Sequence, residues 1–290
     1  MNRSTFAGGL AAFAALPVSA GAQELERAVI AAASESTGTV GVYARRMTPG
    51  PAAVWYRADE RFPSASVIKL LIFVTLFQEI DAHPALWQKK LTLHIDDFVG
   101  GSDFLQNANP GDRYTIASLA RAMIVQSDNT ASNVLISYFG FERINQTAHR
   151  AGLVHTQLHR HFMDYAAIVH HSENLTSAHD MGSLLYQIER GMREALPTVA
   201  SASSCRRMID ILLQQEDRDK IARGLPRGEP LANKTGEIDG VRNDVGIVDP
   251  YGDAPYVLAV LTKDLADFSE GNLAIRRIAK AVNAVLSRPT

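Results

Sequence analysis

The sequence has 290 residues and a formal net charge of -2, and 46% of its residues are hydrophobic. This length and composition allow a sizeable buried core in one or two domains. The small net charge gives no support for binding to nucleic acid or to a membrane surface. The single cysteine, Cys205, excludes an internal disulfide, and we expect it to be a small packing residue rather than a nucleophile.

The first 22 residues have the pattern of a secretory signal peptide. Arg3 is followed by an apolar run over residues 6–16 and by Ala-Gly-Ala at residues 20–22, which is typical of a cleavage site. The apolar run is too short to span a bilayer. We therefore expect cleavage near Gln23, a periplasmic or secreted location, and no stable membrane insertion of the mature chain.

Strand patterns at both ends of the chain flank a helical middle. Strands are expected at residues 39–45, 53–57, 245–248 and 256–262 and after Leu231, and terminal helices at residues 24–33 and 270–286. We predict an α/β (α+β) fold with an antiparallel sheet flanked by helices. Residues 23–62 and 200–290 would form the discontinuous sheet domain, and residues 63–199 an inserted all-helical domain.

A serine and a lysine one helical turn apart, Ser66 and Lys69, form an S-x-x-K motif. Residues 67–80 are apolar almost all round and predict a buried helix, with Pro63 before it and Ser64 able to cap it. Ser66 would lie in the first turn, where unpaired backbone N–H groups favour an alkoxide. Burial would favour neutral Lys69, which could accept the serine proton. Alone, the same pair could be a capping serine and a lysine that reaches to solvent.

A second motif, Ser127-Asp128-Asn129, lies between expected helices at residues 116–125 and 131–138. A turn between two helices can hold two side chains rigidly in a cleft. All three residue types also favour helix starts, so the triplet could instead be only a cap.

A third motif, Lys234-Thr235-Gly236, is expected to end a strand. Gly236 permits close approach of the backbone to a ligand. Lys234 would attract a substrate carboxylate and would keep Lys69 neutral by like-charge repulsion. Arg242 follows, and its guanidinium could bind a carboxylate through two contacts, or it could be a surface arginine on a strand edge.

The three motifs, in this order and over this length, resemble those of the class A-type serine β-lactamases, which share them with penicillin-binding proteins. The resemblance runs from about residue 24 to the C-terminus. It implies a β-lactamase/transpeptidase-like fold with the site between two domains, and a Ser66 acyl-enzyme formed by attack on a β-lactam amide.

The resemblance also implies individual roles for the remaining motif residues. Ser127 would relay a proton to the leaving nitrogen, Asp128 would fix the turn, and Asn129 would bind the substrate amide. Thr235 and Gly236 would contact substrate, and the backbone N–H groups of Ser66 and Glu237 would form the oxyanion pair.

One element of the resembled family is absent. Its Glu-x-x-Leu-Asn segment, whose glutamate activates the deacylating water, does not occur between residues 160 and 176. Asp164 is the nearest substitute by position, and we expect it to be catalytic in preference to Glu173 or Lys69. Alternatively, Asp164 forms an ion pair with Arg160 and closes the loop.

Seven of the nine histidines lie between His149 and His179. They do not complete the H-x-H-x-D-H pattern of metallo-hydrolases, so we expect no metal and no cofactor. The implied partner is a small-molecule β-lactam, bound by a monomer. Two other functions share the motifs: a D,D-peptidase-like hydrolase of peptidoglycan stem peptides, and a sensor that is acylated without turnover.

Overall fold

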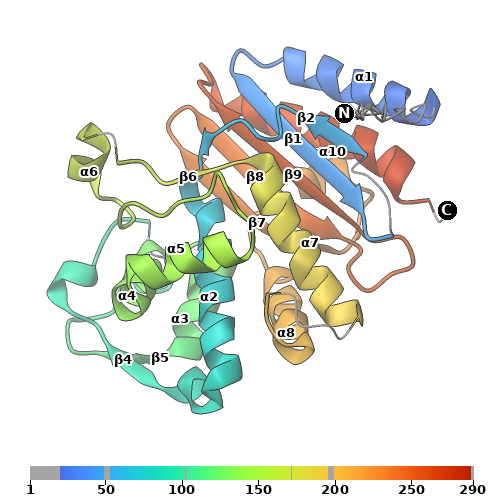
Figure 1. Ribbon diagram of the computed structural model, residues 1–290. Coiled ribbons are helices and arrows are strands. Elements are labelled where there is room, and N and C mark those ends of the chain that lie inside the picture. Colours follow the sequence, from blue (N-terminus) through green and yellow to red (C-terminus); the bar gives the residue numbers. More distant parts are fainter. Residues whose placement is uncertain (1–19, 49–52, 102, 171, 195–198, 289–290) are drawn as a thin grey trace, which may run out of the picture.

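The computed structural model describes residues 20–48, 53–101, 103–170, 172–194 and 199–288. Its main feature is a five-stranded antiparallel sheet in the order β2-β1-β9-β8-β7 (Figure 1). The strands are β1 (Thr39–Arg46), β2 (Val54–Tyr56), β7 (Leu231–Ile238), β8 (Val241–Val248) and β9 (Tyr256–Lys263). The predicted antiparallel sheet flanked by helices is confirmed. The predicted signal peptide falls largely on residues 1–19, outside the described residues.

Helices cover both faces of the sheet. On one face lie α1 (Ala20–Ser34) and α10 (Phe268–Leu286), with the short α9 (Ile221–Gly224) beside α10. On the other face lie α7 (Ala178–Glu194) and α8 (Ala202–Leu212). Residues 256–261 of β9 alternate between the two hydrophobic clusters, which explains why this part of the strand is apolar throughout.

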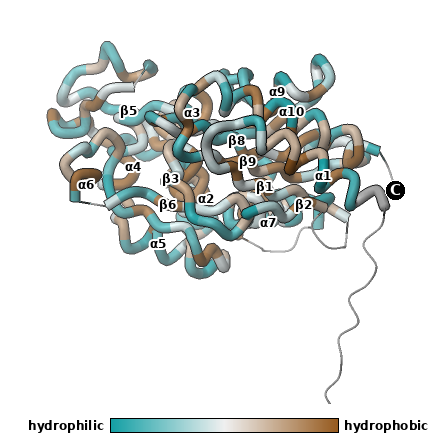
Figure 2. The backbone as a smooth tube through the Cα atoms, turned by 90° about the horizontal axis from the view of Figure 1, so that it is seen from above, coloured by the Kyte–Doolittle hydropathy of each residue, from teal (hydrophilic) through white to brown (hydrophobic). Residues whose placement is uncertain are grey.

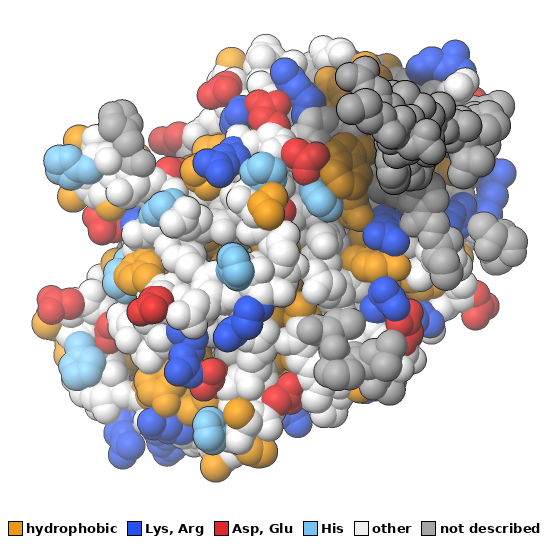
Figure 3. All heavy atoms as spheres, viewed as in Figure 1, with side chains coloured by type: hydrophobic (Ala, Val, Ile, Leu, Met, Phe, Trp, Pro, Cys, Tyr) orange, Lys and Arg blue, Asp and Glu red, His pale blue; other side chains and the backbone are white. Residues whose placement is uncertain are grey.

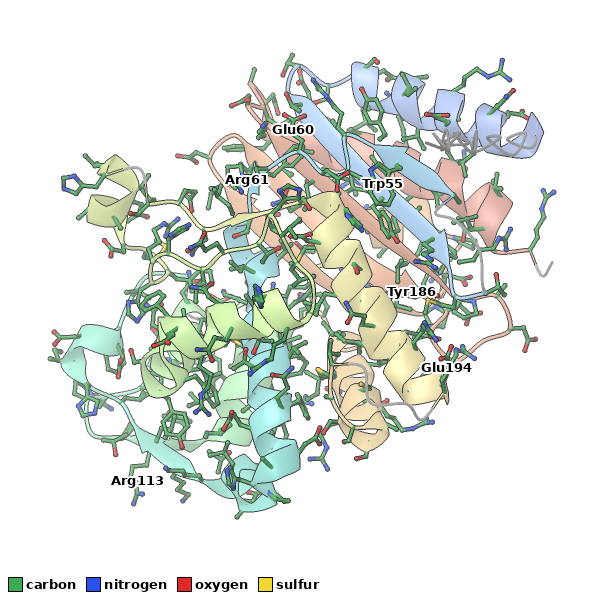
Figure 4. The ribbon with its side chains drawn as sticks, in the orientation of Figure 1. Trp55, Glu60, Arg61, Arg113, Tyr186 and Glu194 are labelled. Atoms are coloured by element: carbon green, nitrogen blue, oxygen red, sulfur yellow. The ribbon has the colours of Figure 1, made fainter. Side chains whose placement is uncertain are left out.

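An aromatic cluster joins α7 to the outer strands. Trp55 of β2 lies beside the start of α7 in Figure 4. Its ring centroid is 4.2 Å from that of His179 and 5.5 Å from that of Tyr43. The Trp55 indole and the His179 Nδ1 both bond to the Asp59 carboxylate. These contacts fix α7 against β1 and β2.

The remaining helices surround one central helix. This helix, α2 (Lys69–Ala82), is buried along most of its length and packs against α3 (Ile116–Val125), α4 (Asn129–Phe139) and α5 (Phe141–Arg150). The predicted helix at residues 116–125 is confirmed at both ends. Among the described helices, none is long and apolar enough to cross a membrane.

The start of the predicted helix at residues 67–80 differs in detail. A 3₁₀ turn, Ala65–Ile68, carries Ser66 and leads directly into α2. The predicted cap by Ser64 is wrong, because its hydroxyl donates to the Ala65 carbonyl oxygen at 3.2 Å instead.

Short elements connect these parts. They are β3 (Phe62–Pro63), β4 (Lys90–Thr92), β5 (Arg113–Thr115), β6 (Leu175–Thr176), α6 (Tyr165–Val169) and the 3₁₀ helices Pro84–Gln88 and Ile95–Asp97. The β3–β6 pairing joins the segment before Ser66 to the end of the 160–176 loop. We retain the division into a sheet domain and an inserted helical domain as a proposal.

Candidate active site

The 3₁₀ turn that carries Ser66 packs directly against β7. A Cβ atom added to Gly236 would lie 2.9 Å from the Ser66 nitrogen and 3.0 Å from the Val67 nitrogen. Only glycine leaves room for this contact between two backbones. Gly236 was predicted to let a ligand approach the backbone closely. In the structure it lets the backbone of the Ser66 turn approach β7 closely. The K-T-G motif lies within β7, which continues to Ile238, and the prediction that it ends a strand is wrong.

Two buried asparagines hold the same turn from either side. Asn243 of β8 donates from Nδ2 to the carbonyl oxygens of Pro63 at 3.0 Å and Ser64 at 3.2 Å. The Ser64 N–H donates to the Asn174 carbonyl oxygen at 2.8 Å. Sequence reasoning missed both residues. No local pattern signals Asn243, because it stands between two other polar residues, Arg242 and Asp244.

The side chain of Lys69 is completely buried beside the S-D-N turn. Its Nζ donates to the Ser127 carbonyl oxygen at 2.6 Å and to Asn129 Oδ1 at 2.8 Å, and lies 3.2 Å from Ser127 Oγ. The Phe162 ring centroid is 4.3 Å from the same nitrogen. These groups exclude water from the lysine amine.

The S-D-N turn is held by its own backbone geometry and by Asp128. Ser127 has a φ of 57°, in the left-handed region that is uncommon for a residue with a side chain. Buried Asp128 caps α4 by accepting from the Ala131 N–H at 2.8 Å, and also accepts from the Leu105 N–H at 3.0 Å. Asp128 therefore caps α4, and it also holds its neighbours Ser127 and Asn129 in place.

Two buried lysines meet at the Ser127 hydroxyl. Lys234 donates from Nζ to Ser127 Oγ at 2.9 Å and to the Thr235 carbonyl oxygen at 2.8 Å. Burial lowers the pKa of Lys69 well below its usual range, the positive charge of Lys234 lowers it further, and Asp128 partly opposes both. Burial also lowers the pKa of Lys234 to about 7, although Asp217 and Asp244 act to raise it. Two buried amines with lowered pKa values and a bridging hydroxyl thus form one connected group.

Two cavities share Ser66, Asn129 and Glu237 in their walls. The first has a volume of about 360 Å³ and is mostly polar, with Ser127, Gln126, Gln215, Asp217, Thr235 and Gly236 among its lining residues. The second has a volume of about 580 Å³ and includes Phe162, Met163, Tyr165, Ile168 and Ile238. Ser66 therefore has a polar space on one side and a largely apolar space on the other.

Arg242 lines neither of these cavities. Its guanidinium donates to the Ile238 carbonyl oxygen at 3.1 Å and lies 4.0 Å from the Phe268 ring centroid. Only 12% of its side chain is exposed, and β8 lies between β9 and β7. The alternative of a surface arginine on a strand edge is therefore wrong.

Lys220 is a buried cation beside the polar cavity that sequence reasoning missed. Its Nζ lies 2.5 Å from carboxylate oxygens of both Asp217 and Glu237. Burial acts to lower the pKa of Lys220, but the two carboxylates outweigh it and raise that pKa above its usual value. The spacing of three residues between Asp217 and Lys220 is compatible with a local ion pair, but no spacing in the sequence signals the contact with Glu237, which lies on β7.

The loop above the site pairs differently from the prediction. Arg160 donates to Glu173 Oε1 at 2.7 Å. Asp164 instead caps α6, where its Oδ1 accepts from the Ala167 N–H at 3.0 Å. The alternative of an Arg160–Asp164 ion pair is therefore wrong. Glu173 lines the larger cavity together with Ser66, whereas Asp164 lines neither cavity.

The histidine-rich segment has other partners. His179 bonds to Asp59, and His161 lies 3.3 Å from the Ser137 hydroxyl. Within the described residues, no group of three His, Cys, Asp or Glu side chains could hold a metal ion.

The family model of the β-lactamase enzyme family matches residues 23–286. This chain belongs to that family. It is a serine hydrolase of the β-lactamase type.

Solved structures of the same fold agree with this assignment. A mutant of PBP-A, in an acyl-enzyme complex with penicillin-G, is 29% identical with a TM-score of 0.82, over 91% of this chain and 97% of that one. A β-lactamase from Sphaerobacter thermophilus is 28% identical with a TM-score of 0.81, over 92% and 99% of the two chains. An ancestral class A β-lactamase is 25% identical with a TM-score of 0.80, over 90% and 99%.

The contact between Gly236 and the nucleophile turn yields a first prediction. Gly236→Ala places a methyl group against two backbone nitrogens, so Ser66 must shift by several tenths of an ångström. We expect acylation by a β-lactam to slow by about tenfold or more, because small misplacements at a reacting centre are costly. Acylation rates from intact-mass spectrometry, with melting temperatures as the folding control, check this. An unchanged rate would contradict the close packing.

Proposed function

We propose that this protein is a serine β-lactamase that hydrolyses the β-lactam amide through an ester on Ser66. The observation that carries the proposal is the buried Lys69, whose pKa is lowered well below its usual range and which is joined through the Ser127 hydroxyl to Lys234, beside the cavity wall that contains Ser66. A serine needs a neighbouring base to become a nucleophile, and a desolvated amine can supply it.

In the acylation step the Ser66 oxygen bonds to the lactam carbonyl carbon and its proton passes to Lys69. The backbone N–H groups of Ser66 and Glu237 stabilise the oxyanion. The amide C–N bond then breaks, and the leaving nitrogen receives a proton from Ser127, which Lys69 replaces. Lys234 and Thr235 bind the substrate carboxylate and Asn129 its amide, with Arg242 as a further candidate for the carboxylate.

Deacylation requires a water molecule and a base beside the ester. A loop carboxylate serves this purpose, and the candidates are Glu173 and Asp164. Glu173 is favoured because it lines the same cavity as Ser66, whereas Asp164 lines neither cavity. General-base assistance of this kind contributes about 10²–10⁴-fold to the rate.

We further propose that the protein acts as an exported monomer, in the periplasm or outside the cell, after removal of residues 1–22. Its function there is the breakdown of β-lactams, which would contribute to antibiotic resistance. The signal-peptide pattern of Arg3, the apolar run at residues 6–16 and the small residues that follow it support this location.

A D,D-peptidase-like or acylated-sensor function is the second candidate. The missing Glu-x-x-Leu-Asn element and the similarity to PBP-A favour it. Release of D-alanine from a peptidoglycan stem peptide identifies the peptidase. A stable mass adduct without turnover of a chromogenic cephalosporin identifies the sensor, and turnover supports the β-lactamase.

The nucleophile is tested by peptide mapping after incubation with a β-lactam. We expect the adduct on Ser66, and Ser66→Ala should lose at least about a thousandfold in rate, as removal of a catalytic nucleophile usually does. Ser64→Ala is the matched control, because the Ser64 hydroxyl contacts only the adjacent backbone carbonyl in the hydrogen bonds it donates. An adduct on Ser127 or Cys205 would refute the mechanism.

The deacylating base is tested by two isosteric changes. Glu173→Gln keeps an acceptor for Arg160 but removes the basic oxygen, so it should acylate at a similar rate and accumulate the acyl-enzyme. Asp164→Asn should turn over like the wild type because an asparagine still caps α6. Intact-mass kinetics separate the two steps. Accumulation in Asp164→Asn alone would return the role to Asp164, and unchanged turnover in both variants would leave Lys69 as the base.

The titration of Lys234 predicts the alkaline limb of the pH profile. Its ammonium form binds the substrate carboxylate, and with a pKa of about 7 this form is lost as the pH rises. We expect KM to rise about tenfold between pH 7 and about pH 8.5, since each unit above the pKa reduces the charged fraction about tenfold. Lys234→Arg keeps its charge and should flatten this limb. An equally steep rise of KM with pH in Lys234→Arg would show that another group causes it.

A further inference from the structure

The polar cavity beside Ser66 has an acidic wall. Among the described residues that line it, none is basic and four are acidic: Asp103, Glu216, Asp217 and Glu237. On the face of the molecule seen in Figure 3, by contrast, acidic and basic side chains are interspersed. The proposed chemistry places the leaving half of the substrate, with its carboxylate, in this cavity, because Ser127 lines it. A carboxylate alone therefore enters a space whose lining carries the same sign of charge.

One of the four acidic residues, Glu237, bonds to a buried cation next to the cavity. This cation is Lys220, which immediately precedes α9, and α9 lies beside α10 in the view of Figure 2. The Lys220 side chain is only 1% exposed, and its Nζ is 2.5 Å from Glu237 Oε1 and from Asp217 Oδ2. Arg242 Nε lies 3.9 Å from the same Glu237 oxygen. Side chains of the protein itself thus cover Lys220 and compensate its charge.

Asp217 and Glu237 differ in how firmly the protein holds them. Asp217 bonds to Lys220 through Oδ2, and its Oδ1 accepts from the Asp219 N–H at 3.0 Å. The Glu237 side chain is 47% exposed, against 30% for Asp217. In the described part of the chain, the Glu237 carboxylate pairs with Lys220 and Arg242 only. Glu237 is therefore the partner that can turn away from Lys220 while Asp217 stays in place.

The position of Glu237 on β7 places it beside the expected substrate carboxylate. Thr235 and Glu237 are two residues apart on this strand, so their side chains lie on the same face, and both residues line the polar cavity. Thr235 and Lys234 are the groups proposed to bind that carboxylate. Burial dominates the pKa of Lys234, and the charges of Lys220 and Glu237 also act on it. The Glu237–Lys220 pair and the bound carboxylate therefore lie within reach of one another.

We propose that Glu237 is a specificity-determining residue that favours substrates whose leaving half carries a cation in addition to its carboxylate. When such a substrate binds, its carboxylate takes the place of Glu237 next to Lys220, and the Glu237 carboxylate pairs with the substrate cation. Each charge then keeps a partner, which a leaving half with a carboxylate alone does not allow. The proposal rests on the proposed function, since it assumes that Ser66 opens a β-lactam ring.

The test compares two cephalosporins that have the same acyl half. Cefotaxime carries an uncharged acetoxymethyl group on its leaving half, and cefepime carries a methylpyrrolidinium cation at the same ring carbon. The quantity measured is the ratio of their second-order acylation rates on the full chain, cefepime over cefotaxime. Glu237→Gln keeps the backbone N–H and the size of the side chain but removes its charge. We expect this variant to reduce the ratio by about fivefold, the order that one partly exposed charge pair contributes.

Glu237→Ala should reduce the ratio to a similar extent, because it removes the carboxylate without leaving an amide beside Lys220. Asp239→Asn is the matched control. It removes an equal charge two residues further along the chain, and Asp239 lines the larger cavity but not the polar one. The acyl half that faces the larger cavity is the same in both compounds, so the ratio in Asp239→Asn should equal that of the wild type.

A ratio unchanged in both Glu237 variants, or reduced equally in Asp239→Asn, would overturn the proposal. Melting temperatures serve as the folding control for the three variants. Absence of any adduct with both cephalosporins and with benzylpenicillin would instead refute the proposed function, which is a distinguishable outcome.

Discussion

The burial of one amine, that of Lys69, is the interaction on which the rest of the site depends. An ammonium removed from water is strongly disfavoured, and this chain adds a second buried lysine, Lys234, whose charge opposes the first. Ser127 and Asn129 accept the N–H bonds of Lys69 and so satisfy the amine without a carboxylate partner. A buried amine with a lowered pKa is thereby maintained three residues after Ser66, at a cost in stability that the surrounding core offsets.

The fold brings the parts of this group together from distant segments. The nucleophile turn comes from the end of a strand pair, the S-D-N turn from a helix junction, and Lys234 from the edge strand of the sheet. Backbone contacts align them: Gly236 lets β7 touch the Ser66 turn, and Asn243 and Asn174 fix the carbonyl and N–H groups before it. The relative positions of these groups are thus set by the packing of the sheet against the Ser66 turn and α2.

The three motifs could be recognised from short residue patterns in the sequence. Most helices and strands could be predicted because they depend on the short-range periodicity of apolar residues. The apolar run after Ser66 and the helix before Ser127 are examples. Contacts between distant segments were not predictable in the same way. The Arg160–Glu173 pair and the Lys220–Glu237 contact depend on how loops cross, and no spacing in the chain encodes them. The strained turn at Ala65, with a φ of 45°, likewise needed the structure.

The central claim is that burial and the charge of Lys234 lower the pKa of Lys69 well below that of an ordinary lysine. Its most direct test is an NMR titration of the lysine Cε resonances in protein labelled with carbon-13 at that position, with Lys69 assigned by substitution. We predict that Lys69 titrates well below the exposed lysines, and that Lys234→Met moves its midpoint upwards. A Lys69 midpoint among those of the exposed lysines, or one unaffected by Lys234→Met, would contradict the account.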